Sequence, residues 1–220
     1  MESIQRSLVF LVIFTGFCSC YHLNMKEMWM KKDGQTPPDF CKGLDCPKFT
    51  ETFTSKEYSI RQYEPSAWAS IRITGIDNDA ASEEAFFKLF SYIQGENENG
   101  TKIPMTVPVI CSIKPGAGPV CASNFTFSFM IPFKFQNNTP KPTNPEIKLT
   151  TLEAHKVYVR EYGGFSNQTV FPKEALALAD ALNSSQTYNE TMYYTAGYDS
   201  PFVLENRHNE IWFFATNSVE

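Results

Sequence analysis

The sequence predicts an α+β fold in which one antiparallel sheet, curled toward a barrel, is flanked by two helices. Three observations predict it. Short runs of alternating apolar and polar residues occur through most of the chain, as in strands that bury one face. Two segments instead have apolar residues at helical spacing. The order strand, strand, helix, strand, strand occurs twice, so two similar units can complete one sheet.

The first unit begins near position 58. We expect its strands over 58–63, 67–74, 103–111 and 121–131, and its helix over 80–94. Asn78 or Asp79 can cap the helix and Gly95 can end it, because a short polar side chain accepts the first free N–H groups and glycine suits the residue after a helix. Pro104 and Pro108 interrupt the third strand, which predicts an edge position or a bulge there.

The second unit repeats this order after a proline-rich connector over 139–145. We expect its strands over 147–152, 155–162, 192–198 and 210–216, and its helix over 172–182. Pro172 suits the first helical turn. The residues expected to face the sheet are Ala175, Leu178, Ala179 and Leu182. Arg61-Gln62-Tyr63 recurs as Arg160-Glu161-Tyr162 in what we take to be corresponding strands, which favours an internal duplication.

Residues 1–20 are typical of a signal peptide, with Arg6 in a short polar start, an apolar run over 8–14 and small residues before Cys20. The apolar run is shorter than the roughly 20 residues that a membrane helix needs. We expect cleavage and a soluble, secreted, extracellular protein; the alternative is an uncleaved signal anchor. Residues 21–57 contain prolines and cysteines but little periodicity, and we expect them to be a lead-in segment before a domain over 58–216.

Six Asn-x-Ser/Thr sequons agree with secretion, because an attached glycan must point to solvent. Their asparagines are Asn99, Asn124, Asn137, Asn167, Asn183 and Asn189. Asn124 lies within an expected strand and is therefore the sequon least suited to carry a glycan.

Four cysteines remain after the expected cleavage, and an even number in an oxidising compartment favours disulfides over a metal. They allow three pairings. We favour Cys111–Cys121, because the prolines and glycines between them predict a turn that joins antiparallel strands. Cys41–Cys46 then closes a small loop. No histidine lies beside either pair, so the sequence predicts no zinc site.

The composition and motifs exclude several function classes. The 19 basic and 24 acidic residues give a net charge of −5 without a basic run, so nucleic-acid binding is not expected. The sequence lacks zinc-protease, phosphate-loop and dinucleotide motifs. Gly164-Phe165-Ser166-Asn167-Gln168 begins like a nucleophile elbow but lacks its final glycine. We therefore expect no catalytic residues and no bound metal.

Aromatic residues predict a binding cleft. Phe86, Phe87 and Phe90 lie on the first helix, and the segment 197–202 adds tyrosine, proline and phenylalanine. Together they can form an apolar, aromatic-lined cleft for a flat ligand. The alternative is that the three helix phenylalanines are simply core residues.

Several motifs occur in a fixed order along the chain. They are KIPMTVPV over 102–109, PGAGP over 115–119, YTAGYDSP over 194–201 and NRHNEIW over 206–212. These motifs, together with 58–63 and 91–95, resemble the SOUL/heme-binding-protein family, and specifically its SOUL-type branch. The likeness covers about 57–214, most of the expected mature chain.

The resemblance implies a twisted, barrel-like antiparallel sheet of eight or nine strands with two flanking helices and internal pseudo-symmetry. It also implies that heme or another porphyrin binds in a hydrophobic cleft between the first helix and the loop before the last strand. The corresponding positions are Phe86, Leu89 and Phe90 on the helix and Tyr198, Phe202 and Val203 on the loop.

The chain departs from the family at three positions. Glu83 and Val203 stand where relatives can have basic residues that meet heme propionates. Gln62 replaces the histidine proposed as an axial ligand, and glutamine is not a usual ligand of heme iron. The leading hypothesis is a secreted, non-enzymatic glycoprotein that binds a tetrapyrrole by stacking and burial, with its axial ligand unknown. The alternative is an extracellular protein-interaction module that kept the fold and lost heme binding.

Overall fold

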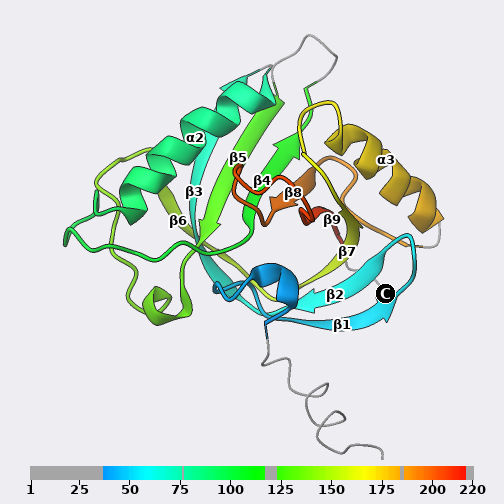
Figure 1. Ribbon diagram of the computed structural model, residues 1–220, viewed down its shortest axis with the longest axis horizontal. Coiled ribbons are helices and arrows are strands. Elements are labelled where there is room, and N and C mark those ends of the chain that lie inside the picture. Colours follow the sequence, from blue (N-terminus) through cyan, green and yellow to red (C-terminus); the bar gives the residue numbers. More distant parts are fainter. Residues whose placement is uncertain (1–36, 76, 117–122, 184–185, 217–220) are drawn as a thin grey trace, which may run out of the picture. The chain divides into compact units, whose positions relative to one another are not determined.

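The computed structural model describes residues 37–75, 77–116, 123–183 and 186–216 of the 220-residue chain. The expected signal peptide and the first part of the expected lead-in segment lie outside these residues. The described residues form one curled antiparallel sheet with two helices packed on it (Figure 1). The predicted α+β fold class is therefore confirmed.

The sheet has nine strands in the order β1-β2-β7-β9-β8-β4-β5-β3-β6. In chain order the elements are β1 (Phe49–Thr54), β2 (Ser59–Tyr63), β3 (Ser66–Gly75), α2 (Asn78–Ile93), β4 (Val109–Lys114), β5 (Ser123–Met130), β6 (Lys148–Leu152), β7 (His155–Tyr162), α3 (Phe171–Leu182), β8 (Tyr193–Gly197) and β9 (Asn209–Phe214).

The strand order contains an internal two-fold relation, which confirms the predicted repeat. The relation matches β2 with β6, β3 with β7, β4 with β8 and β5 with β9. When each strand is replaced by its match, the order of strands from β2 to β6 in the sheet becomes the same order read backwards. The helices follow this exchange, because α2 packs on β3 and β5 while α3 packs on β7 and β9. At the centre of the repeat lies the β4–β8 pair, with Cys111 opposite Thr195. β1 is the one strand of the described chain outside the repeat.

The recurring tripeptide does not mark this repeat. Arg61-Gln62-Tyr63 lies on β2 and Arg160-Glu161-Tyr162 on β7, whereas the two-fold relation matches β2 with β6. β2 and β7 are instead neighbours in the sheet, with Arg61 opposite Val157. The correspondence expected from these tripeptides is wrong.

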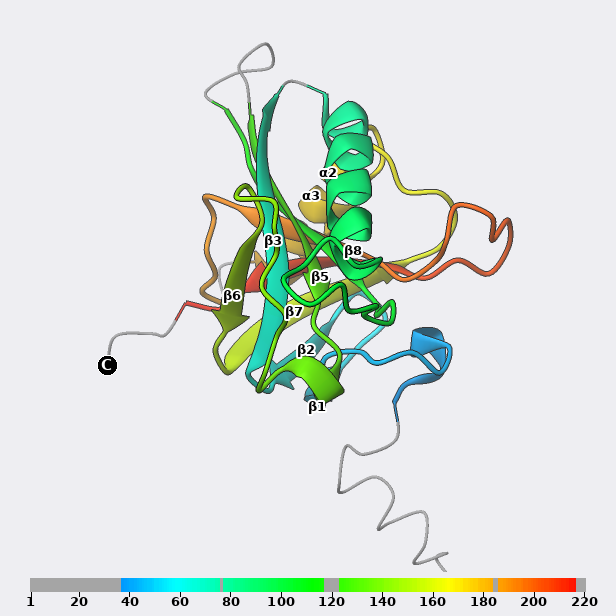
Figure 2. The same cartoon turned by 90° about the vertical axis from the view of Figure 1, so that its left-hand side faces the viewer.

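Both helices pack on the same face of the sheet through one core cluster. This cluster includes Ala85 and Leu89 of α2 and Leu178 and Leu182 of α3, together with inward residues of five strands. Figure 2 shows α2 running beside β3, with α3 on the same side of the sheet. Within the described residues, neither helix is long and apolar enough to cross a membrane.

The opposite face of the sheet carries a second buried cluster. It includes Tyr63, Trp68 and Trp212 together with Cys41 and Cys46. Part of the segment expected to be a lead-in outside the core therefore contributes two buried cysteines and the strand β1, which pairs with β2. β1 is an edge strand with almost every residue exposed, so it lacks the burial alternation by which a strand is predicted.

The strand expected over 103–111 begins only at Val109. Pro104 and Pro108 have no N–H to donate to a neighbouring strand, so the preceding residues do not join the ladder. The Val107 N–H instead donates to the Asp45 carbonyl oxygen over 3.0 Å. This contact brings the segment before β4 against the residues around the two buried cysteines.

Helix α2 is capped by Asp77, not by Asn78 or Asp79. The Asp77 Oδ1 atom accepts hydrogen bonds from the N–H groups of Asp79 (2.8 Å) and Ala80 (3.3 Å). The Asn78 side chain turns inward, with its amide nitrogen 3.9 Å from the sulfur of Cys111. The cap is therefore one residue earlier than the sequence predicted.

Replacing Asp77 with alanine should lower the free energy of unfolding by about 1 kcal/mol, the usual loss when an N-cap side chain is removed. Asp79→Ala keeps the backbone N–H that the cap accepts and loses only a favourable charge in the first turn, worth about 0.3 kcal/mol. Urea denaturation at pH 7 would measure both variants. Equal losses would contradict the assignment of the cap.

Candidate functional site

A groove of about 610 Å³ lies between helix α2 and the loop that follows β8. Its volume is within the range of roughly 300–1,000 Å³ that small-molecule sites occupy. The lining is mostly apolar. It comes from α2, from the segment before β4 together with its first residue Val109, from the end of β8 and the loop 198–202, and from Leu44.

Helix α2 supplies an aromatic wall. Phe86 stacks on Phe90 with ring centroids 5.6 Å apart and meets Phe129 of the sheet edge-on at the same distance. Phe87 is 60% exposed and Phe90 is 39% exposed. Exposed aromatic side chains that border a groove are typical of a surface that a ligand or partner covers.

Arg207 contacts the backbone of the loop 198–202. One guanidinium nitrogen, Nη1, donates to the carbonyl oxygens of Ser200 and Val203 at 2.7 Å each, and Nη2 donates to that of Asp199 at 3.3 Å. The guanidinium also lies 4.6 Å from the ring centroid of Phe165. These contacts fix the backbone of the loop while its side chains remain on the groove side.

A disulfide loop, residues 41–46, completes the groove. Cys41 and Cys46 are bonded, with Cα atoms 6.2 Å apart. Leu44 lines the groove, Lys42 forms an ion pair with Asp199, and the backbone of the loop accepts a hydrogen bond from the segment before β4. The disulfide loop thus docks on two of the other groove walls.

Four of the six predicted site residues line the groove: Phe86, Phe90, Tyr198 and Phe202. Leu89 does not, because it is 0% exposed and packs into the core beneath α2. Val203 also lies outside the lining, and its carbonyl oxygen serves as an acceptor for Arg207. The alternative that the helix phenylalanines are only core residues is wrong for the exposed ones.

Other residues in the lining were not predicted, above all Leu44, Met105 and Val107. Met105 and Val107 belong to the KIPMTVPV motif, whose apolar residues the sequence pattern predicts to lie in a strand. Leu44 gave little signal, being one apolar residue between two cysteines in a segment without periodicity.

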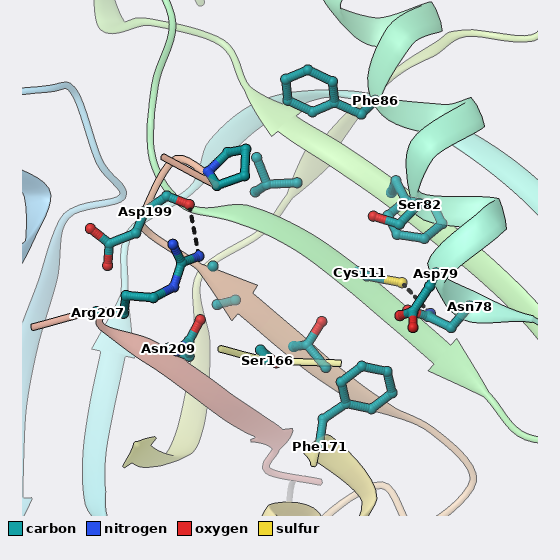
Figure 3. A pocket seen from close by; sticks show the side chains of 16 residues that line it. Asn78, Asp79, Ser82, Phe86, Cys111, Ser166, Phe171, Asp199, Arg207 and Asn209 are labelled. Carbon is teal, nitrogen blue, oxygen red and sulfur yellow. Dashed lines mark hydrogen bonds between the residues drawn. The ribbon is translucent and has the colours of Figure 1, made fainter. Parts of the chain in front are cut away.

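A smaller, more polar pocket of about 240 Å³ adjoins the groove and shares Phe86 and Val109 with it. Figure 3 shows Asn78 and Cys111 at one side of this pocket and Arg207 at the other. Burial raises the pKa of the Cys111 thiol to about 12. The thiol is therefore protonated at neutral pH and is a poor nucleophile.

Cys111 is a free, buried cysteine, which contradicts the predicted Cys111–Cys121 disulfide. Its neighbour across the β4–β5 ladder is Phe127, and its sulfur faces the Asn78 amide of α2. The turn residues predicted the hairpin correctly but not its register. Cys121 itself lies outside the described residues.

A cavity of about 460 Å³ occupies the place that the two-fold relation makes equivalent to the groove. It lies against α3, the segment before β8, and Pro115 after β4. From α3 it receives Ala175, Leu176 and Ala179, where α2 supplies phenylalanines to the groove. The sequon residue Asn189 is part of its lining.

The groove is better suited to contact the face of a flat ring than to ligate the iron of a heme. Histidine, cysteine, methionine and tyrosine are the usual ligands, and the described lining offers Met105 and Tyr198. The Tyr198 hydroxyl donates to Glu210 Oε2 over 2.9 Å, and burial together with the Glu210 charge raises the pKa of this phenol well above its ordinary value. Gln62 lies on β2 opposite Lys156, away from the lining.

Behind Tyr198 lies a buried charged cluster centred on Glu210, which is fully buried. Its carboxylate accepts hydrogen bonds from Arg61 Nη1 at 2.8 Å, Trp212 Nε1 at 2.6 Å and the Tyr198 hydroxyl. His208 Nε2 lies 2.7 Å from the same carboxylate. The cluster fixes the end of β8, where the loop 198–202 begins.

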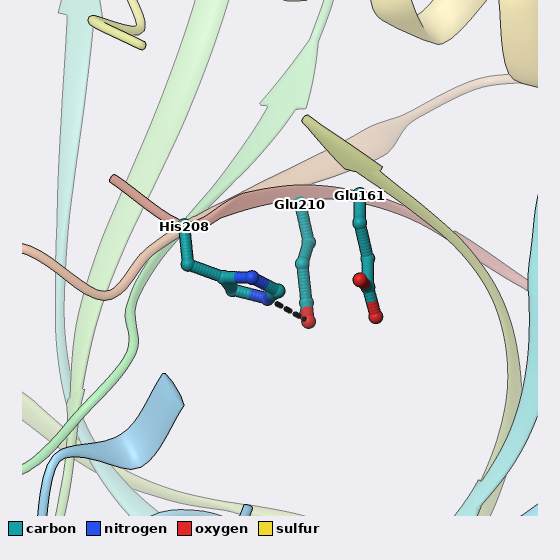
Figure 4. Close-up of side chains that lie close together, drawn as sticks. All are labelled: Glu161, His208 and Glu210. Atoms are coloured by element: carbon teal, nitrogen blue, oxygen red, sulfur yellow. Dashed lines mark hydrogen bonds and ion pairs between the residues drawn. The ribbon is translucent and has the colours of Figure 1, made fainter. Parts of the chain in front are cut away.

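Glu161, His208 and Glu210 have the side-chain types of a metal site and lie close together (Figure 4). Arg61, however, forms ion pairs with both carboxylates. A guanidinium already supplies the positive charge that a metal ion would bring, and it would repel one. We therefore assign this cluster a structural role.

The charges of the cluster set the pKa of Glu210. Burial alone would raise this pKa, but the Arg61 charge and the hydrogen bond to His208 outweigh it and lower the pKa to about 2. Glu210 is therefore ionised in the folded protein at neutral and mildly acidic pH.

Comparisons with known proteins find similar sequences over most of the chain. The family model described as SOUL heme-binding protein matches residues 44–214. The human protein named Heme-binding protein 2 is 40% identical over 161 residues, which cover 73% of this chain and 78% of that protein. Heme-binding protein 1 of Bos taurus is 32% identical over 155 residues, covering 70% of this chain and 81% of that protein.

Solved structures with little sequence identity share the fold. The C-terminal domain of EcmrR superposes with a TM-score of 0.57 at 9% identity, covering 74% of this chain and 98% of that chain. An uncharacterized conserved protein from Listeria innocua gives a TM-score of 0.51 at 10% identity, covering 72% and 92%. At such identities the likeness concerns the fold alone.

The depressed pKa of Glu210 predicts acid-sensitive stability. Because this pKa is lowered on folding, its contribution is fully present above the unfolded value near 4.5 and is lost as the pH falls toward about 2. We expect the free energy of unfolding to fall by on the order of 3 kcal/mol over that window. Urea denaturation at pH 7, 4.5, 3 and 2 would measure it.

Glu210→Gln should be less stable at pH 7, because it leaves Arg61 buried without its main partner, and should lose most of this pH dependence. Glu205→Gln, at an exposed position, is the control and should retain it. An unchanged pH dependence in Glu210→Gln would refute the assignment.

Proposed function

Because the chain belongs to the SOUL heme-binding protein family, we propose that it binds heme or a related tetrapyrrole in the groove beside α2. The observation that carries the proposal is an open apolar groove of about 610 Å³ bordered by Phe86, Phe87, Phe90 and Phe202. A tetrapyrrole is a flat, largely apolar ring, which such a surface can cover on one side.

Binding would rest on stacking and burial. Covering about 200 Å² of apolar surface contributes on the order of 5 kcal/mol before the cost of association. Aromatic contacts add to this. The described lining offers Met105 and Tyr198 but neither histidine nor cysteine, and the Tyr198 hydroxyl is already hydrogen-bonded to Glu210, so iron ligation is not part of the proposal.

We propose a binding role without catalysis. The names of the relatives refer to binding. Three titratable groups close to the groove have other roles: the Tyr198 hydroxyl and Glu210 are hydrogen-bonded to each other, and the pKa of the Cys111 thiol is raised by burial. None of these three is placed to exchange a proton with a ligand in the groove.

We further propose that the protein is a secreted, extracellular glycoprotein with residues 1–20 removed. The exposed side chains of Asn99, Asn137, Asn167 and Asn183 support this, because a glycan needs access to solvent. Asn124 is also exposed but lies on β5, where its side-chain oxygen accepts a hydrogen bond from Thr74. The Cys41–Cys46 disulfide suits an oxidising compartment.

A second candidate function is an extracellular protein-interaction module. Phe202 is 89% exposed and Leu204 is 73% exposed, and both lie on the chain between β8 and β9. An apolar projection of this kind can anchor a protein partner. The departures at Glu83, Val203 and Gln62 also favour a fold that has lost heme binding.

Titration with protoporphyrin IX and with hemin, followed by absorbance and ring fluorescence, tests the proposed function. We expect one saturable site, with similar affinities for the two rings because iron is not ligated. Phe87→Ser combined with Phe202→Ser should weaken binding at least about tenfold, since it removes about 1.4 kcal/mol or more of apolar contact. Both positions are largely exposed, so the variant should fold.

Leu149→Ser, which removes an exposed apolar side chain from β6 outside the groove, is the matched control and should bind as the parent does. If binding saturates with neither ring, the proposal is contradicted and the interaction module is favoured. A hemin complex that is much tighter and has the absorbance spectrum of ligated heme would show instead that the protein ligates the iron.

Expression in a eukaryotic secretory cell line tests the localisation. We expect the protein in the medium, beginning at Tyr21, with an apparent mass that falls on treatment with peptide-N-glycosidase. Retention of the unprocessed chain in the cells, or an unchanged mass after treatment, would count against a secreted glycoprotein.

A further inference from the structure

We infer that the groove selects its ring by charge and prefers a flat ligand with a neutral or positively charged rim to one with free carboxylates. This inference rests on the proposed function, because it names the ligand class of the same groove. It follows from which charges line the groove and from how the nearby cations are already used.

The charged side chains in the described lining are both acidic: Glu83 and Asp199. The Asp199 side chain is fully buried and is already neutralised, since it pairs with Lys42 and accepts the His208 N–H over 2.6 Å. Glu83 differs. It is exposed on α2, one turn before Phe86 and Phe87, and forms no ion pair within the described residues.

The nearby cations are committed to holding the groove together. Lys42 ties the disulfide loop to Asp199. Arg207 donates to three carbonyl groups of the loop after β8. On α2, Lys88 forms ion pairs with Glu84 and Glu146. A ligand carboxylate could recruit one of these cations only by breaking a contact that shapes the site.

A carboxylate on the ligand would therefore meet Glu83 without a compensating cation. Two like charges about 4 Å apart in water weaken an association about fivefold, and more in a partly desolvated groove. A positive group at the same place gains a similar factor. Both effects should shrink as salt is added, because the charges are exposed.

Three versions of one ring test this. Protoporphyrin IX carries two carboxylates, its dimethyl ester carries none, and its bis-amide with ethylenediamine carries two ammonium groups. Fluorescence anisotropy at nanomolar ring concentration would give each affinity for the glycosylated protein in low and high salt. We expect the bis-amine to bind most tightly and the diacid about tenfold or more weakly, with the differences reduced in high salt.

Glu83→Gln should bring the three affinities together, and Glu83→Lys should make the diacid the preferred ring. Glu84→Gln is the matched control on the adjacent position of α2. Glu84 lies outside the lining and pairs with Lys88, so the order of affinities should stay as in the parent.

The results distinguish a failure of the charge preference from a failure of the proposed function. If the rings bind but the diacid is as tight as the others, or if Glu83→Gln changes nothing, the charge preference is overturned while ring binding stands. If none of the three rings saturates, the proposed function fails and the inference falls with it.

Discussion

The ion pair between Arg61 and Glu210 joins parts of the chain that are far apart in sequence and that together support the groove. Burying two charges is costly unless each keeps several partners. Glu210 has hydrogen bonds from Tyr198 and Trp212, and the Arg61 guanidinium lies 4.4 Å from the ring centroid of Phe49 on β1. Strands β1, β2 and β9 and the end of β8 are thereby held in one arrangement.

The groove extends outward from this cluster. Phe40 stacks on His208 with ring centroids 4.2 Å apart and meets Tyr198 edge-on, so the disulfide loop that follows it is seated on the cluster. Lys42 then reaches Asp199 on the loop after β8. Walls fixed in this way are preorganised, which lowers the cost of ordering side chains when a ligand binds.

The helices, most strands and the repeat could be predicted because their residues follow clear periods. The predictions that were wrong concerned features that depend on side-chain packing and strand register. Leu89 and Phe87 lie on one amphipathic helix, and only contact with the sheet decides that the first is buried and the second faces the groove. Hairpin register placed Phe127, not a cysteine, opposite Cys111. β1 was not predicted because it is an exposed edge strand, and its residues do not alternate between buried and exposed positions.

The cavity beside α3 gives the internal two-fold relation a consequence for valency. The repeated sheet has two equivalent cavities, but the halves have diverged: one carries phenylalanines, while the other carries alanines and the sequon residue Asn189 in its lining. A sugar attached there would cover the second cavity. The protein would then be monovalent although its architecture is symmetric, and it would not bridge two ligands or two ligand-bearing surfaces.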